Sequence, residues 1–508
     1  MKKYKLLTML ILFGFILSSC SLDDNIDPNN PQSDQLSARM RLASAEVSSY
    51  VPLASSMNGL GNVFMNAYSG NIYWFGNPLT KECNLAIDNS FYQRIWNTTY
   101  PAVSNLQTII DGDTLLVYHR AIALILKVHY MQYIVDLYND VPYSEAFQRV
   151  NNVAPKYDKS IDIYKSFIAE LDTAVALIND NEENPDIVVN PTEDVIMGGD
   201  MEKWLKFANT VKLRVLMRMS ETTNAEAITL RDAGLASLTG AQFVDFDVTI
   251  QPGYSAASAA NQNPIYNAFG RRLYDGTTNT YGWRLYLASD HVAKALNGTS
   301  TITSGVLDPR RAALFRLKAD TVSGVIQGDQ KNAAYTESRF SLFGGWLYTP
   351  ADEGSAHDGY IMTRAESEFL QSEAAVEYPA IFTDAQTHFT NGIQASFDMY
   401  GLTADAAAYI TAIDAKDNAG WTASANKIAA IQYQRWIALI HINGIETYLS
   451  YLKTGYPVTP LALTAQKSRK PYRLVYPQTE YTSNATNVPS MTGDDCFVIN
   501  DFTPFWLK

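Results

Sequence analysis

The sequence is poor in basic residues, and this excludes one large class of function. Of its 508 residues, 39 are Lys or Arg and 52 are Asp or Glu, which gives a formal net charge of -13 at pH 7. Nucleic-acid binding needs a basic face that neutralises phosphates, and the chain has no dense basic run. We therefore expect no nucleic-acid partner.

Cysteine and histidine are also scarce. Three cysteines are too few for a disulfide-dense scaffold, and Cys83 and Cys496 fit no metal-binding spacing. In an exported protein these two could form a disulfide, but we favour two buried free thiols. The six histidines are scattered along the chain, and His129 lies in an apolar helical segment that favours a hydrogen-bonded core position. The sequence therefore predicts no metal site.

Motifs of the common catalytic classes are absent. The chain has no Gly-x-Ser-x-Gly elbow, no His-Glu-x-x-His, no phosphate-binding Gly-Lys-Ser/Thr loop and no cysteine pair at zinc spacing. A glycosidase needs only two carboxylates at the right separation, so 52 acidic residues leave that chemistry open, and Asp352-Glu353 is the pair to inspect. We predict no catalytic residues and no cofactor.

Only the N-terminal segment has a long apolar run. Residues 6–17 are apolar and follow Lys2, Lys3 and Lys5, but twelve residues are too few to cross a membrane, which takes roughly 20. This pattern is typical of an export signal, which we place at residues 1–19.

The end of that signal resembles the bacterial lipobox. Leu17-Ser18-Ser19 precede Cys20, so we expect cleavage before Cys20 and lipid attachment to it. Several acyl chains hold a protein on a membrane where one chain is marginal. Residues 21–25 (SLDDN) resemble acidic tags that send some lipoproteins to the outer face of the outer membrane, and residues 20–33 would form a lipidated tether.

The rest of the chain, residues 34–508, favours one mainly helical domain. Apolar residues recur at three- and four-residue steps in several segments, and residues 114–138 are apolar nearly all round, which indicates a central helix. Loops rich in Gly, Asn, Ser, Thr and Tyr are expected at 58–82, 251–284, 320–360 and 455–508. Alternation over residues 244–250 indicates one short strand or hairpin.

Several residues are placed to begin or end these helices. Asp158 is available as the N-cap of the helix that follows it. Thr363 and Glu366 have the spacing of a capping box, in which the hydroxyl and the carboxylate each bind an amide of the other residue. Gly455 stands where a helix end favours a left-handed residue, with Pro457 just beyond.

Aromatic residues in the loops are the best candidates for ligand binding. A neutral oligosaccharide offers an apolar C–H face to a ring and hydroxyls to nearby amides. Three loops combine rings with Gly or Asn, and they contain the candidate ligand-binding residues Tyr73, Trp74, Phe75, Asn77, Tyr281, Trp283, Trp346 and Tyr348. The alternative is that each ring holds its loop to the helical body. Trp204 and Trp436 lie on helical stripes and are expected in the core.

A series of segments resembles the SusD/RagB family of nutrient-binding outer-membrane lipoproteins. The first are residues 130–146 (YMQYIVDLYNDVPYSEA) and 199–209 (GDMEKWLKFAN), the latter continuing to 212–214. The others follow in the family's order at 308–310, 362–374, 434–439, 443–446, 454–457 and 476–477. Tyr451-Leu452-Lys453 stand where the family often has more basic residues, which leaves the subfamily open.

The resemblance implies a fold and a partner. It implies a scaffold of tetratricopeptide-like helix pairs with irregular loops and little β-structure. It also implies that the protein works with a TonB-dependent transporter of the SusC type, to which it delivers an oligomeric nutrient at the cell exterior. Family members take glycans, and some are associated with peptides, so both ligand classes stay open.

Two other functions are consistent with the sequence. The chain could be a lipid-anchored glycan hydrolase, which would release products from a glycan. It could also be a helical adaptor that recognises only protein, in which case the loop aromatics would be interface anchors. We favour the non-catalytic, nutrient-binding lipoprotein.

Overall fold

The computed structural model describes residues 37–181, 187–332, 335–336 and 338–508. The expected signal peptide at 1–19, the lipid attachment at Cys20 and the tether at 20–33 lie outside the described residues. Within the part that is described, no helix is both long and apolar enough to cross a membrane.

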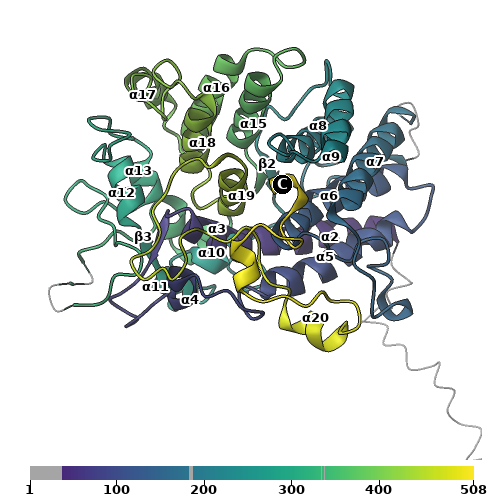
Figure 1. The fold of residues 1–508 in the computed structure, drawn as a ribbon, viewed down its shortest axis with the longest axis horizontal. Helices are drawn as coiled ribbons and strands as arrows, with labels where there is room; N and C mark the ends of the chain where they lie inside the picture. The colour runs from purple at the N-terminus through teal and green to yellow at the C-terminus, as the bar shows by residue number, and fades with distance from the viewer. Residues whose placement is uncertain (1–36, 182–186, 333–334, 337) are drawn as a thin grey trace, which may run out of the picture.

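The chain is mainly α-helical, as predicted (Figure 1). The long helices are α2 (Ala38–Pro52), α5 (Arg94–Ile110), α6 (Val117–Tyr138), α7 (Ser160–Asn179), α8 (Met201–Arg218), α9 (Ala225–Ser237), α15 (Arg364–Glu377), α16 (Ala385–Met399), α17 (Thr403–Ile413), α18 (Lys427–Ala438) and α19 (Gly444–Thr454). The short helices are α3 (Asn58–Phe64), α4 (Thr80–Asn84), α10 (Pro264–Phe269), α11 (Tyr281–Leu285), α12 (Asp290–Leu296), α13 (Arg311–Leu314), α14 (Ala351–Ser355) and α20 (Gln478–Ser483). A π-helical turn, η3 (Leu53–Met57), joins α2 to α3, and the 3-10 turns are η4 (Arg149–Asn151), η6 (Gly345–Tyr348), η7 (Asp494–Phe497) and η8 (Phe505–Leu507).

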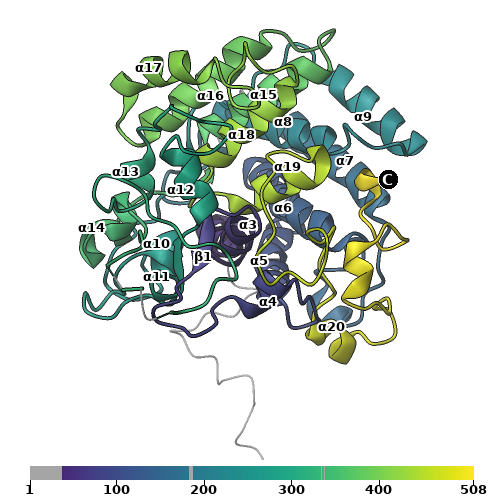
Figure 2. The same cartoon turned by 60° about the vertical axis from the view of Figure 1, so that its left-hand side comes forward.

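Consecutive helices pack on one another in two groups. In the first group α2 packs on α5, α5 on α6, α6 on α7 and α7 on α8. In the second group α15 packs on α16 and α18, α16 on α17, and α18 on α19, while α8 contacts α15. Nearly all of α6 is buried, which confirms the predicted central helix. The two turned views show the short helices α10 and α11 gathered beside α3, away from α7 and α9 (Figures 1 and 2).

The β-structure consists of two small antiparallel pairs within the described residues. Strand β1 (Tyr68–Gly70) pairs with β3 (Tyr286–Ala288), and β2 (Val248–Ile250) pairs with β4 (Gly359–Met362). The strand predicted from the alternation over 244–250 therefore exists, but only its last three residues belong to the pair. Val244 is nevertheless buried, so the alternation reflects burial beyond the hydrogen-bonded strand.

The loop predicted at 58–82 is wrong at its start, where the chain forms the buried helix α3. Its Gly and Asn residues serve close packing against the start of α19. A Cβ on Gly61 would lie 2.0 Å from the carbonyl carbon of Gly444, so only glycine allows this approach. Asn58 Oδ1 accepts a hydrogen bond from the Gly444 amide at 3.0 Å, and Asn62 Nδ2 donates to Asn58 Oδ1 at 2.7 Å.

Asp158 is not the N-cap of α7: Lys159 holds that position without a side-chain cap, and an aspartate from a distant segment accepts from the first amide of the helix. Asp140 Oδ1 accepts a hydrogen bond from the Ser160 amide at 2.9 Å. Asp158 instead turns toward the end of α6, where its Oδ2 accepts from the Tyr143 and Ser144 amides at 2.8 Å each. The two carboxylates thus connect the start of α7 to the turn after α6. Each accepts hydrogen bonds from amides of the other segment, which sequence spacing does not predict.

The capping box at α15 is half formed. Thr363 Oγ1 accepts from the Glu366 amide at 3.1 Å, as predicted. The Glu366 carboxylate does not return to the Thr363 amide; it accepts from Asn443 Nδ2 at 3.2 Å across to the start of α19. The helix end at Gly455 is confirmed, because this residue has a φ of 79° at the C-cap of α19.

The interior holds a network of paired charges. Arg218 Nε lies 3.0 Å from Asp136 Oδ2, and Arg218 Nη2 lies 2.7 Å from Glu446 Oε2. Arg435 Nη2 lies 3.0 Å from Glu446 Oε1. Burial raises the pKa of Asp136 to about 6 in spite of Arg218. Burial would also raise the pKa of Glu446, but the two arginines bring it below its usual value.

The remaining core predictions have mixed outcomes. Cys83 and Cys496 are both buried free thiols, as predicted. Trp204 and Trp436 are buried in the core, as predicted. His129 is fully buried, but neither ring nitrogen has a hydrogen-bond partner among the described residues, so the expected hydrogen bond is wrong. Burial, with a contribution from the neighbouring Arg214 charge, lowers the pKa of His129 well below its ordinary value.

Candidate ligand-binding site

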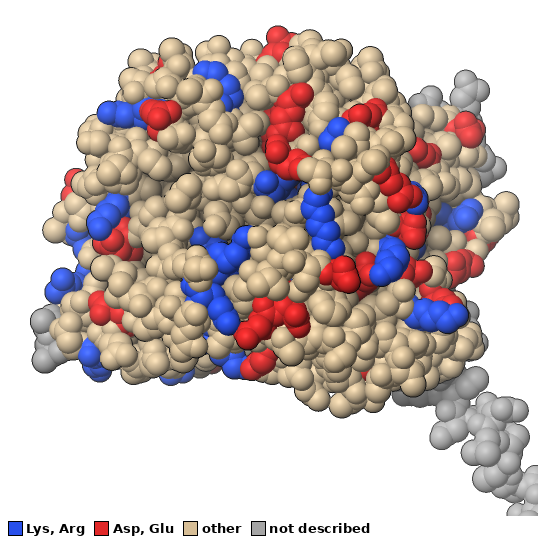
Figure 3. All heavy atoms as spheres, viewed as in Figure 1, with Lys and Arg blue, Asp and Glu red and all other residues tan. Residues whose placement is uncertain are grey.

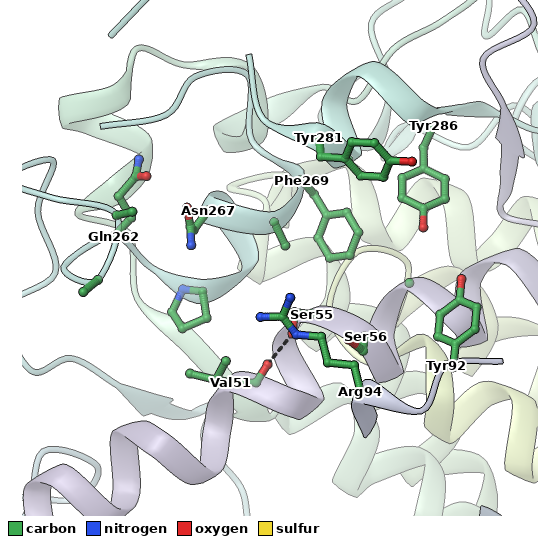
Figure 4. A pocket seen from close by; sticks show the side chains of 16 residues that line it. Val51, Ser55, Ser56, Tyr92, Arg94, Gln262, Asn267, Phe269, Tyr281 and Tyr286 are labelled. Atoms are coloured by element: carbon green, nitrogen blue, oxygen red, sulfur yellow. Dashed lines mark hydrogen bonds between the residues drawn. The ribbon is translucent and has the colours of Figure 1, made fainter. Parts of the chain in front are cut away.

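A cavity of about 550 Å³ opens beside the short helices α10 and α11 (Figure 4). Its lining comes from the end of α2, from η3 and α3, from the start of α5, and from the segment 259–286. The lining residues are Val51, Ser55, Ser56, Gly59, Tyr92, Arg94, Ala259, Ala260, Gln262, Pro264, Asn267, Ala268, Phe269, Tyr281, Gly282 and Tyr286. This volume lies within the range of about 300–1,000 Å³ that small-molecule sites occupy.

Local sequence positions the α10–α11 wall. The Asn263 side chain caps α10 by accepting hydrogen bonds from two amides of its first turn. The Thr280 hydroxyl caps α11 in the same way, through one amide. Gly282 lets α11 lie against α10, since a Cβ there would be 2.3 Å from the Ala268 carbonyl oxygen. These three features present the Tyr281 ring at the cavity edge, with 67% of the residue exposed.

Aromatic rings form one side of the cavity. Phe269 and Tyr286 lie with their ring centroids 5.9 Å apart, and Figure 4 shows Tyr281 above them and Tyr92 opposite. The Tyr92 phenol is hydrogen-bonded to Tyr286 and to Glu82, and burial raises its pKa well above the ordinary value. Burial also raises the pKa of Glu82. This side therefore offers ring faces and phenolic hydroxyls that stay protonated at neutral pH.

Polar side chains form the other side. Ser56, Arg94 and Asn267 line it, and Figure 4 shows the Arg94 guanidinium directed into the cavity. Gln262 is already engaged, because its Nε2 donates to Ser355 Oγ at 2.7 Å. The dashed line in Figure 4 is the hydrogen bond from Ser55 Oγ to a backbone carbonyl, at 2.7 Å.

A second hollow of about 400 Å³ shares two lining residues with the first. Tyr92 and Tyr281 line both hollows and so stand between them. Of the predicted site residues, Phe75, Asn77 and Tyr281 line this second hollow. The rings of Phe75 and Tyr281 meet edge to face at 6.3 Å between centroids. The structure thus brings together residues from two of the three predicted loops.

Tyr73 and Trp74 lie beside these hollows rather than in them. They line a narrow space of about 50 Å³ together with Trp283 and Arg284. Trp74 is 43% exposed, and the Arg284 guanidinium carbon lies 4.9 Å from its ring centroid. Lys331 Nζ lies 4.9 Å from the centroid of the Tyr73 ring. Both rings therefore stack against cationic side chains of the protein.

The other predicted aromatics pack against the body. Trp283 is buried and stacks on Tyr348 with centroids 5.7 Å apart, and the Arg316 guanidinium carbon lies 3.9 Å from the Tyr348 centroid. Trp346 stacks on His357 at 4.4 Å. Trp346 and Tyr348 line neither hollow. Of the predicted residues in the loops around 281–284 and 344–348, only Tyr281 lines the cavity.

Several lining residues were not predicted from the sequence. They are Tyr92, Arg94, Gln262, Asn267, Phe269 and Tyr286. Those within 251–284 lie in a long segment that the sequence predicts to be a loop. No sequence pattern indicates a ligand-binding role for Tyr92 and Arg94, because they lie at the start of a helix that belongs to the scaffold.

The cavity lining contains no Asp, Glu, His or Cys, the residue types that most often form acid–base pairs and metal sites. Asp352 and Glu353 are exposed on α14 and line neither hollow. Across the described part of the chain, no three His, Cys, Asp or Glu residues are grouped to hold a metal ion. Rings on one side and hydrogen-bonding groups on the other suit a ligand with both an apolar face and polar groups.

Comparison with known proteins places the chain in a family. A SusD-like family model, described as "Starch-binding associating with outer membrane", matches residues 39–477. No curated protein matches the chain in sequence.

Solved structures share the fold across nearly the whole chain. A chitin-binding SusD homologue from Flavobacterium johnsoniae has a TM-score of 0.70 at 22% identity, covering 92% of this chain and 98% of its own. A SusD homologue from Parabacteroides distasonis has a TM-score of 0.71 at 20% identity, with 92% and 98% covered. A SusD/RagB family protein from Bacteroides thetaiotaomicron has a TM-score of 0.70 at 19% identity, with 93% and 99% covered. With the family model matched over most of its length, the chain belongs to the SusD-like family.

Proposed function

We propose that this protein is a non-catalytic glycan-binding protein that captures an oligosaccharide in the two hollows joined at Tyr281. The observation that carries the proposal is the ring-lined cavity of about 550 Å³, with Tyr281 exposed between it and the second hollow. Sugar rings would stack on Tyr281 and Phe269, while their hydroxyls meet Asn267 and Ser56.

The relatives support the choice of a carbohydrate. The matching family model is described as starch-binding, and the similar Flavobacterium protein is described as chitin-binding. The two hollows lie side by side, which suits an oligomer better than a single small molecule. The absence of Asp, Glu, His and Cys from the cavity lining is consistent with capture without cleavage.

The proposal includes a place and a partner. The family description includes association with the outer membrane. Lipid attachment at Cys20 would anchor the protein there, facing the cell exterior, and the captured glycan would pass to a TonB-dependent transporter of the SusC type. Extraction in mild detergent should recover the protein with a large membrane transporter, and recovery without one under several detergents would contradict the partnership.

Calorimetric titration tests the binding function. The full-length protein in detergent is titrated with chitin, starch, pectic and glycosaminoglycan oligosaccharides, and each mixture is then analysed for shortened products. We expect binding of at least one glycan class and no products. Release of products would overturn the non-catalytic function, and binding of none of these glycans would overturn the ligand class.

A further inference from the structure

We infer that the cavity takes an acidic glycan and that Arg94 binds its negatively charged group, a carboxylate or a sulfate ester. This inference rests on the proposed glycan-binding function and narrows its substrate class. It is carried by the chemistry of one side chain and by the composition of the lining around it.

The Arg94 guanidinium has no partner in the part of the chain that the structure describes. Among the described residues it makes no hydrogen bond, ion pair or ring contact, although it points into the cavity (Figure 4). Lys81 in the second hollow is different, because its Nζ lies 2.6 Å from Asp88 Oδ2. Arg284, near the rim, stacks on Trp74. Of these three cationic side chains, Arg94 is therefore the one that can offer all of its N–H donors, five in number, to a ligand.

The surroundings of Arg94 favour an anion. No acidic residue lines the cavity itself, and Arg94 is the one charged residue in its lining. Arg94 is also the first residue of α5, whose first turn has no acidic side chain and no side-chain cap. The start of a helix carries a positive partial charge, which adds to that of the guanidinium.

Salt screening limits long-range repulsion between the acidic chain and an anionic ligand. On the face shown in Figure 3, acidic and basic side chains are interspersed rather than gathered in one acidic field. Salt screens exposed charges beyond about 8–10 Å at physiological ionic strength, so the groups that line the cavity dominate. A carboxylate or sulfate can accept two parallel hydrogen bonds from one guanidinium, which adds geometric specificity.

The rest of the cavity suits the sugar that carries the anion. The side chains of Asn267 and Ser56 make no hydrogen bond within the described structure, and both line the cavity with Arg94. They can bind hydroxyl or acetamido groups beside the charged one. Phe269 and Tyr281 on the opposite side offer ring faces to the apolar face of the same sugar. One acidic sugar residue would engage all of these groups together.

Two matched pairs of probes test the inference. The full-length protein in detergent is titrated with a galacturonic acid oligosaccharide and with its methyl ester, and with a sulfated glycosaminoglycan oligosaccharide and its desulfated form. In at least one pair, we expect the charged member to bind at least tenfold more tightly than its neutral counterpart. The pair that shows the preference identifies the anion as carboxylate or sulfate.

Variants assign the preference to Arg94. R94Q should bring the affinities for the charged and neutral members within twofold of each other, and R94K should retain part of the preference. Arg149 is the matched control, because it lines neither hollow. Its guanidinium donates a hydrogen bond to Thr108 Oγ1 at 2.9 Å. R149Q removes the same charge from the protein and should keep the preference unchanged.

The outcomes separate this inference from the proposed function. Equal affinity for charged and neutral members, with glycan binding retained, would overturn the inference and leave the proposed function standing. Equal losses from R94Q and R149Q would also overturn it, since the effect would come from net charge alone. Binding of no oligosaccharide in the wider panel would overturn the proposed function itself, as would binding of an acidic peptide alone.

Discussion

The helical body and the cavity wall differ in how they hold charged side chains. In the body, Arg218 is 3% exposed and pairs with both Asp136 and Glu446. In the cavity wall, Arg94 is exposed and pairs with nothing in the described structure. A buried charge without a partner costs several kcal/mol, whereas an exposed one is stabilised by water until a ligand replaces that water.

This difference separates scaffold from site. The segments that carry the family resemblance supply the buried network, with Asp136 from 130–146, Arg435 from 434–439 and Glu446 from 443–446. None of these three lines the cavity. The family motifs therefore build the helical body, and the proposed ligand contacts of Tyr281 and Arg94 lie outside those motifs.

The same substitution in the two regions gives the largest contrast. Arg218→Met removes the partner of two buried carboxylates and should lower the free energy of unfolding by about 3–5 kcal/mol. Arg94→Met removes no partner and should change it by less than about 0.5 kcal/mol. Urea unfolding followed by circular dichroism measures both. Similar losses for the two variants would show that the distinction between paired and unpaired charges is wrong.

Lys470 sharpens the comparison because it is a buried charge with neutral partners. It is 3% exposed, its Nζ donates to Thr459 Oγ1 at 2.5 Å, and it lies 4.4 Å from the centroid of the Tyr451 ring. Burial lowers its pKa to about 7. Burial and the Lys470 charge lower the pKa of the nearby His291 to about 4, so His291 stays neutral above pH 6.

Stability should therefore rise with pH through this lysine. Between pH 7 and about 10.4, the unfolded chain binds a proton at Lys470 that the folded chain has largely lost. The free energy of unfolding should increase by about 2 kcal/mol from pH 7 to pH 9, relative to the Lys470→Met variant. Urea unfolding at three pH values checks this. Equal pH slopes for the two proteins would mean that Lys470 titrates normally in the folded state.

The next prediction tests the ring between the two hollows. Tyr281→Ala should weaken glycan binding by about 1 kcal/mol or more, roughly fivefold in Kd, because the exposed ring provides a stacking face. Stability should change by less than about 0.5 kcal/mol, since the ring is mostly exposed. Calorimetric titration with one oligosaccharide measures the affinity.

Tyr274 is the matched control for Tyr281. It is 47% exposed and lines neither hollow. Tyr274→Ala should leave the affinity unchanged. If both tyrosine variants lose affinity equally, or neither does, the sugar does not stack at the junction of the hollows.

Periodicity and composition predicted the scaffold well and identified a few of the residues that line the two hollows. The stripes of apolar residues predicted the helices because burial against neighbouring helices has the period of the helix itself. They could not predict that Asp140 accepts from the first amide of α7 or that Asn443 is the partner of Glu366, since these contacts join segments distant in sequence. The Gly- and Asn-rich composition around Gly61 predicts a loop. Glycine is needed at position 61 for a different reason, which is the close contact with Gly444.

The site shows the same limit. Aromatic loops predicted Tyr281 and Phe75, because rings among Gly and Asn residues are often exposed. The same rule also selected Trp283, which is buried on Tyr348. Arg94 could not be predicted, since an arginine at a helix start is ordinary until the cavity beside it and the lack of a carboxylate partner are both seen.

The smallest predicted effect concerns Trp74, the most exposed tryptophan among the sequence candidates. Because its ring lies beside the hollows and already stacks on Arg284, Trp74→Ala should weaken glycan binding by only about 0.5 kcal/mol. Arg284→Gln should have a similar effect, and the double variant should lose little more than either single one, since each removes the same contact. Unfolding should be unaffected in all three. An affinity loss for Trp74→Ala that equals or exceeds that of Tyr281→Ala would show that Trp74 is the main stacking ring. The ligand would then have to displace the Arg284 guanidinium from the Trp74 ring.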